Sequence, residues 1–175
     1  MTGAGTVDLK DRPTDCWIMK VLSVVGYRKS GKTTTIEGLI PLLRAEGRVA
    51  TVKSLHHEVE IDTPGKDTHR HRESGAETVV GITPSLTFSV TADTREKERR
   101  LQETLTSLES RGFDFVVVEG FKSVPLPAVA IGEVEESAVE GTIHLRAADG
   151  DSADVETIAD LVCDLPDWES DATAE

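Results

Sequence analysis

The chain has 175 residues, enough for one domain with its own core, and 32 acidic residues against 19 basic ones give it a formal net charge of −13. So negative a surface repels the nucleic-acid backbone and argues against a general DNA- or RNA-binding protein. No apolar run approaches the length of a membrane span and no signal-peptide pattern opens the chain, so we expect a cytoplasmic protein. Cys16 and Cys163 match no metal or redox spacing, so we expect no disulfide.

The acidic residues dominate the end of the chain, where no Lys or Arg follows Arg146, but they also occur throughout the rest. One interpretation is adaptation to high salt, in which hydrated carboxylates keep a halophilic protein dissolved. The other is an ordinary protein with an acidic tail. A melting curve against KCl concentration distinguishes them, because only the first interpretation requires stabilisation by molar salt.

The first elements are a leader, a strand and a helix. Residues 1–16 are polar and lack periodicity, which predicts a disordered leader. Residues 17–25 are almost all apolar, as is typical of a strand buried on both faces. A helix is predicted after the next loop and ends at Gly47. Its apolar residues recur at helical spacing: Ile36, Leu39, Ile40 and Leu43.

The middle of the chain is more polar. Residues 49–53 predict a second strand, and residues 54–67 form a loop of a length that is often functional. A short helix is predicted over 68–76. Residues 77–80 and 85–90 are strand candidates separated by a turn.

The second half alternates helices with strands. A helix is predicted over 94–111, where Asp93 and Glu96 resemble a capping box, and a last helix over 154–163. Strands are predicted over 113–118, 128–131 and 142–145. This alternation predicts an α/β, three-layer fold with a mostly parallel central sheet. We expect one nucleotide-binding domain over residues 17–165 and an acidic disordered tail over 166–175.

A glycine-rich loop connects the first predicted strand to the first predicted helix. Gly26-x-x-x-x-Gly31-Lys32-Thr33 matches the phosphate-binding loop pattern. The glycines let backbone N–H groups converge on a polyphosphate, and the helix N-terminus adds its partial positive charge. In this pattern Lys32 reaches the β- and γ-phosphates and the Thr33 hydroxyl binds Mg²⁺. With a strand before it and a helix after it, the loop predicts a P-loop NTPase-like fold.

Two acidic residues are candidates for the rest of the site. Glu119 directly follows a predicted buried strand, where a carboxylate often supports a magnesium-bound phosphate; alternatively, it is a surface residue that opens a turn with Gly120. Asp62, in Asp62-Thr-Pro-Gly65, resembles the Asp-x-x-Gly turn of nucleotide switches or belongs to a solvated Pro-Gly turn. No other general base is evident, so we expect a weak enzyme at most.

Basic residues and histidines lie close to Asp62 in the sequence. Lys66 and Asp67, with Arg70 and Arg72, are positioned to order around a γ-phosphate. The spacing of the histidines at 56, 57, 69 and 71 does not favour zinc, because neighbouring side chains diverge. The chain has no Asn-Lys-x-Asp element, so spacing leaves the choice between GTP and ATP open.

Several segments occur together in a specific order. They are Gly26 to Thr34, Lys53-Ser-Leu-His-His57, Asp62-Thr-Pro-Gly-Lys-Asp67 with Arg70 and Arg72, Gly75-Ala76, and Val117-Val-Glu-Gly-Phe-Lys122. In this order they resemble the MobB family of molybdopterin-guanine dinucleotide biosynthesis adaptor proteins. The resemblance covers about Met19 to Leu145, and Ser54 stands where the family often has His.

The resemblance implies a homodimeric GTP-binding protein with weak Mg²⁺-dependent GTPase activity. Such a protein assists the molybdopterin guanylyltransferase and other molybdenum cofactor proteins. It implies Thr33 and Glu119 as metal ligands. Asp62 and Glu119 are the candidate catalytic residues, because the chain offers no other evident general base. The implied GTP contacts are Gly26, Tyr27, Arg28, Lys29, Ser30, Gly31, Lys32, Thr33, Thr34, Lys53, Lys66, Asp67, Arg70, Phe121 and Lys122.

The alternative function is a small-molecule P-loop kinase that uses ATP. Arg70 and Arg72 would then lie on a lid that closes over the phosphates and excludes water. Release of ADP that depends on an acceptor would indicate the kinase, and slow acceptor-independent turnover would indicate the adaptor.

Overall fold

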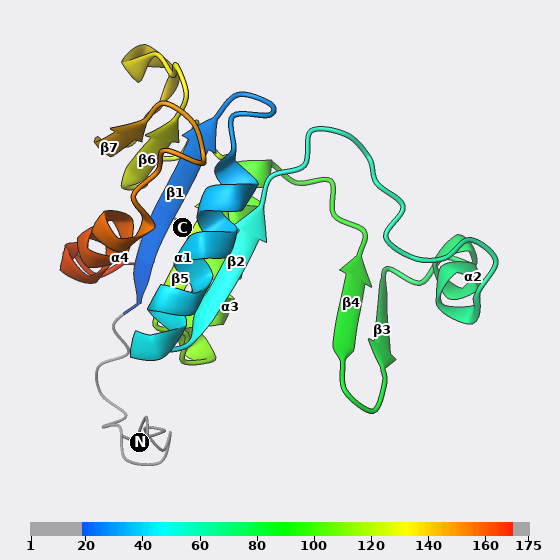
Figure 1. Cartoon of the computed structure of the whole chain (residues 1–175). Coiled ribbons are helices and arrows are strands. Elements are labelled where there is room, and N and C mark those ends of the chain that lie inside the picture. Colours follow the sequence, from blue (N-terminus) through cyan, green and yellow to red (C-terminus); the bar gives the residue numbers. More distant parts are fainter. Residues whose placement is uncertain (1–18, 170–175) are drawn as a thin grey trace. The chain divides into compact units, whose positions relative to one another are not determined.

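The computed structural model describes residues 19–169, which form two compact units: Leu55–Arg100, and the residues before and after that segment. The larger unit is built on a five-stranded sheet of order β2-β5-β1-β6-β7, in which every neighbouring pair is parallel (Figure 1). The strands are β1 (Lys20–Gly26), β2 (Val49–Lys53), β5 (Phe115–Glu119), β6 (Ala128–Ile131) and β7 (Ile143–Ala147).

Helices cover both faces of this sheet. Alternate residues of a strand point to opposite faces, and in β1 Leu22 and Val24 pack on one side while Val21 packs on the other. The first side is covered by α1 (Lys32–Glu46) and α4 (Val155–Asp164), and the second by α3 (Lys97–Ser110) from Leu101 onwards. The predicted three-layer α/β fold with a mostly parallel sheet is therefore confirmed.

Most predicted elements of this unit occur within a few residues of their predicted bounds. β2 and β6 coincide with the predicted ranges, and α4 begins one residue later because Asp154 is its N-cap, accepting a hydrogen bond from the Thr157 N–H. A short 3-10 turn, η2 (Glu136–Ala138), was not predicted. The predicted capping box at Asp93 is wrong, since α3 begins only at Lys97 and the Asp93 carboxylate instead accepts hydrogen bonds from Arg95.

The two ends of the predicted domain differ in what the structure describes. The predicted leader, residues 1–16, lies outside the described residues. Residues 166–169 belong to the predicted tail, and among them Trp168 packs on the larger unit. The Trp168 N–H donates to the Met19 carbonyl over 2.7 Å, and its side chain contacts the core cluster beneath α3. Trp168 thus covers apolar surface of the core, which the acidic composition of this segment did not indicate.

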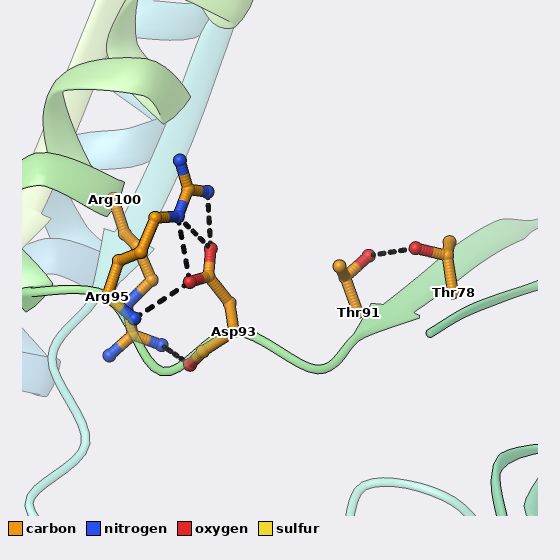
Figure 2. Close-up of polar contacts among 5 residues, drawn as sticks. All are labelled: Thr78, Thr91, Asp93, Arg95 and Arg100. Carbon is orange, nitrogen blue, oxygen red and sulfur yellow. Dashed lines mark hydrogen bonds and ion pairs between the residues drawn. The ribbon is translucent and has the colours of Figure 1, made fainter. Parts of the chain in front are cut away.

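The second unit contains the other predicted helix and strands. It consists of α2 (Asp67–Glu73) and an antiparallel hairpin of β3 (Thr78–Ile82) and β4 (Thr87–Thr91), which form their own two-stranded sheet. The Thr78 and Thr91 hydroxyls lie 3.1 Å apart across this pair (Figure 2). The domain predicted over residues 17–165 thus comprises two compact units.

A charged turn follows β4 in the same unit. The Asp93 carboxylate accepts hydrogen bonds from the backbone and the guanidinium of Arg95, and the Arg100 guanidinium donates to the Asp93 carbonyl over 3.1 Å (Figure 2). The Arg95 side chain is the main reason that the pKa of Asp93 falls to about 2.

Across residues 19–169, no helix is both long and apolar enough to cross a membrane.

Candidate phosphate-binding site

The predicted phosphate-binding loop connects β1 directly to α1. β1 ends at Gly26 and α1 begins at Lys32, and the loop between them turns through positive φ angles of 65° at Lys29 and 96° at Gly31. A side chain does not fit at Gly26, since its Cβ would lie 2.4 Å from Ser30 Oγ and 2.5 Å from the Ile131 carbonyl oxygen. The loop therefore has the strand–loop–helix context that its sequence pattern requires.

The loop packs backbone to backbone against the segment that follows β7. The Gly150 N–H donates to the Ser30 carbonyl over 3.1 Å. A Cβ on Gly31 would lie 2.4 Å from the Gly150 nitrogen, and a Cβ on Gly150 would lie 2.4 Å from the Gly31 carbonyl oxygen. Gly150 was not predicted to contact the phosphate-binding loop. Its only sign in the sequence is the presence of a glycine in the acidic loop after the last predicted strand.

Two other lysines and one carboxylate lie close enough to Lys32 for their charges to act on it. Burial is the main cause that lowers the pKa of Lys32, the nearby charge of Glu119 raises it, and Lys53 and Lys122 lower it further. The Lys32 ammonium donates to the Tyr27 carbonyl over 2.8 Å, so it lies folded against the loop. A concentration of positive charge in a chain with a net charge of −13 indicates a site for an anion.

Glu119 lies at the end of β5, beside the ends of β1 and β2. In the parallel register it is level with Val24 of β1 and Lys53 of β2. The Lys53 ammonium donates to Glu119 Oε2 over 2.9 Å, and the Glu119 side chain is only 14% exposed. The predicted position of Glu119 at the sheet edge is thus observed, and its pairing with Lys53 is a contact that spacing did not indicate.

The chain after Glu119 folds back toward the phosphate-binding loop. Gly120 and Phe121 have positive φ angles of 94° and 56°, and Ser23 Oγ donates to the Gly120 carbonyl over 2.8 Å. This turn places the Lys122 ammonium 4.2 Å from the centre of the Tyr27 ring, in a cation–π contact. Lys122 therefore lies close to the loop, whereas Phe121 packs on the core cluster beneath α3. A contact of either residue with a nucleotide stays a prediction.

The remaining predicted site residues belong to the other compact unit. Asp62 Oδ1 accepts a hydrogen bond from the Thr63 N–H over 2.8 Å, and Lys66 immediately precedes α2. Asp67 and Arg70, on α2, form a loose ion pair of 4.0 Å. Arg72, which the kinase interpretation places on a lid, is bound to Glu60 over 2.6 Å. A role for Asp62, Lys66, Asp67 and Arg70 at the phosphates stays a prediction.

The donor set at the loop suits a hard cation that arrives with a phosphate. Thr33, in the first turn of α1, and Glu119 offer a hydroxyl and a carboxylate, the oxygen ligands that Mg²⁺ prefers. Within residues 19–169 no group of three or more His, Cys, Asp or Glu side chains could hold a metal ion. Mg²⁺ would therefore need phosphate oxygens and water to complete its coordination.

Gly150→Ala tests the contact between the two loops. The added methyl group overlaps the Gly31 backbone, so we expect the free energy of unfolding in urea to fall by about 1–3 kcal/mol. Asp151→Ala, at the neighbouring exposed position, is the control and should change stability by less than about 0.5 kcal/mol. Equal stability of the Gly150→Ala and wild-type proteins would contradict the close packing.

Comparisons with known proteins identify one family. Residues 21–147 match the family model of molybdopterin guanine dinucleotide synthesis protein B, MobB. The molybdopterin-guanine dinucleotide biosynthesis adapter protein of Escherichia coli is 28% identical over 161 residues, 83% of this chain and 92% of the relative. That of Haemophilus influenzae is 34% identical over 116 residues, 66% of this chain and 64% of the relative. A further relative from Methanocaldococcus jannaschii is 38% identical over 104 residues, which is 59% of this chain but only 42% of that relative.

The fold is shared with solved structures as well. The crystal structure of Bacillus subtilis MobB superposes with a TM-score of 0.63 at 25% sequence identity, covering 86% of this chain and all of that one. The family model covers most of the described residues, including the phosphate-binding loop, Lys53, Glu119 and Lys122. The chain belongs to the MobB family.

Proposed function

We propose that this chain is a cytoplasmic GTP-binding accessory protein for the biosynthesis of molybdopterin guanine dinucleotide, with weak Mg²⁺-dependent GTPase activity. The observation that carries the proposal is the phosphate-binding loop with Lys32, Lys53 and Lys122 gathered beside it. The names of the relatives from Escherichia coli and Haemophilus influenzae, both adapter proteins of this pathway, support the biosynthetic role.

The loop and its lysines account for triphosphate binding. The Lys32 ammonium, which is bonded to the Tyr27 carbonyl, would exchange that neutral acceptor for phosphate oxygens. Hydrogen bonds between charged groups are about twice as strong as neutral ones, so the exchange favours the bound state. A bound anion would also offset the repulsion among Lys32, Lys53 and Lys122.

Weak hydrolysis follows from the scarcity of a free general base. Thr33 and Glu119 would hold Mg²⁺, which neutralises charge on the phosphates when bound. Glu119 accepts a hydrogen bond from Lys53 and is therefore poorly placed to take a proton from water. Asp62, the other predicted catalytic residue, accepts a hydrogen bond from the Thr63 N–H in the second unit. Slow turnover suits a protein that acts through partners, which we propose are the guanylyltransferase and other molybdenum cofactor proteins.

The hairpin of the second unit supports a homodimer. Among the described residues β3 and β4 pair only with each other, and one face of the hairpin exposes Val80 (55%) and Ile82 (80%). An isolated two-stranded hairpin is marginally stable, and its unpaired edges attract further strands. A second copy offers the same edge and the same apolar face, so a two-fold contact is self-complementary. We propose that the hairpin forms the homodimer interface.

Lys32→Ala tests the proposed nucleotide site. Removal of the ammonium should weaken Mg²⁺–GTP binding about tenfold to a hundredfold in calorimetric titration, because a charge-assisted hydrogen bond to phosphate is lost. Arg44→Ala, which removes a cation from the last turn of the same helix, is the control and should bind GTP as the wild type does. Unchanged GTP affinity of Lys32→Ala would refute the site, and ADP release that depends on an added acceptor would favour the kinase.

Ile82→Lys tests the proposed interface. The side chain is 80% exposed in the single chain, so the substitution should leave the fold intact but place a charge in the apolar contact. We expect a dimeric wild type and a monomeric variant by analytical ultracentrifugation. Thr106→Lys, at an exposed position of α3, should remain dimeric. The same mass for Ile82→Lys and wild type would exclude the hairpin as the interface.

A further inference from the structure

The loop between β7 and α4 lies at the phosphate-binding edge, is rich in carboxylates and has no role in the proposed function. It follows the carboxyl end of a parallel strand, where ligands of such sheets bind. The Gly150–Ser30 hydrogen bond and the lack of room for a Cβ at Gly31 or Gly150 hold it directly against the phosphate-binding loop. Residues next to Gly150 would therefore lie close to a nucleotide bound there.

The two sides of the phosphate-binding loop differ in charge. In the sheet order β2-β5-β1-β6-β7, Lys53 and Glu119 lie on the β5 and β2 side of β1, whereas the loop after β7 lies on the opposite side (Figure 1). That loop carries Asp149, Asp151 and Asp154 and no basic residue. A polyphosphate is attracted to the lysines and repelled by the aspartates. The uncharged base of the nucleotide therefore belongs on the side of the loop after β7.

Asp149 and Asp154 form hydrogen bonds that stabilise the loop and the start of α4. Asp149 Oδ1 accepts a hydrogen bond from the Ser152 N–H over 2.8 Å, and hydrogen bonds from Ser152 are the main cause of its lowered pKa. Asp154 caps α4 by accepting from the Thr157 N–H over 3.1 Å and the Thr157 hydroxyl over 2.8 Å. These contacts hold the loop in place on both sides of residue 151.

Asp151 is the aspartate of this loop that remains available. Its side chain is exposed, and within residues 148–154 it is the one carboxylate that makes no hydrogen bond or ion pair in the described structure. The start of α4 is fixed as well, since Val155 packs so closely on α1 that a Cβ at Gly38 would lie 3.1 Å from Val155 Cγ1. A free carboxylate thus extends from a loop that is anchored to the phosphate-binding loop and to α1.

We infer that the Asp151 carboxylate accepts hydrogen bonds from the guanine base and gives the site its preference for GTP over ATP. The inference rests on the proposed GTP-binding function. The pairing edge of guanine presents two donors side by side, the N1–H and the 2-amino group, and both can donate to one carboxylate. Adenine presents the N1 lone pair at the same place, which repels a carboxylate. Asp151 would thus supply the discrimination for which this chain has no Asn-Lys-x-Asp element.

Asp151→Asn tests the inference with two opposite outcomes. The amide can no longer accept both guanine donors, so GTP should bind about tenfold to a hundredfold more weakly in Mg²⁺. Xanthine carries an oxygen in place of the 2-amino group, and the amide N–H₂ can donate to it. Xanthosine triphosphate should therefore bind the variant more tightly than it binds the wild type. Both affinities are measured by titration calorimetry, and equal melting temperatures show that the fold is intact.

Two controls separate the possible failures. Asp160→Asn, which makes the same change at an exposed position on α4, should bind both nucleotides as the wild type does. If the wild type binds GTP but Asp151→Asn leaves both affinities unchanged, the inference is wrong and the proposed function stands. The inference is also wrong if Asp149→Asn, rather than Asp151→Asn, exchanges the preference. If the wild type does not bind GTP at all, the proposed function fails and the inference fails with it.

Discussion

The parallel pairing of β1 with β5 on one side and β6 on the other is the constraint on which the rest of the larger unit depends. Parallel strands end at the same edge of a sheet, so the residues that follow them meet there although they are far apart in the chain. The phosphate-binding loop follows β1, Glu119 ends β5, Lys53 ends β2, and Gly150 follows β7. The helices on both faces bury the apolar strands and leave this edge as the place where polar side chains can gather.

The arrangement of this edge also requires two loops to pack with their backbones in direct contact. Gly26, Gly31 and Gly150 each lie where a Cβ would fall within 2.5 Å of another residue. This packing brings the acidic loop after β7 against a loop whose other side faces Lys53 and Glu119. In a chain with a net charge of −13, this separation of positive from negative charge across one loop would orient a nucleotide bound there.

Much of this arrangement was predictable because local patterns carry it. β2 and β6 have the predicted bounds, since short apolar runs between turn residues leave little choice. The phosphate-binding loop was found through glycine spacing, and Glu119 through its place after a buried strand. The limits of local patterns are equally visible at Asp93, whose carboxylate accepts hydrogen bonds from the backbone and guanidinium of Arg95 instead of capping a helix.

The contacts that the sequence did not reveal join residues that are distant in the chain. Gly150 meets Ser30 and Lys53 meets Glu119 only because the sheet order brings strand ends together, and no spacing rule encodes that order. The two strands of the β3–β4 hairpin were predicted, but the sequence pattern did not indicate that they form an antiparallel sheet separate from the parallel one. Trp168 shows the same limit, since its partner Met19 lies at the other end of the described chain.

The central claim is that the loop between β1 and α1 binds a guanine nucleotide. Its most direct test is calorimetric titration of the wild-type protein with GTP and then with ATP, in Mg²⁺ and high KCl. We expect saturable GTP binding that is at least about tenfold tighter than ATP binding, because one carboxylate favours one base. Equal affinity for the two nucleotides, a preference for ATP, or no binding of either would contradict it.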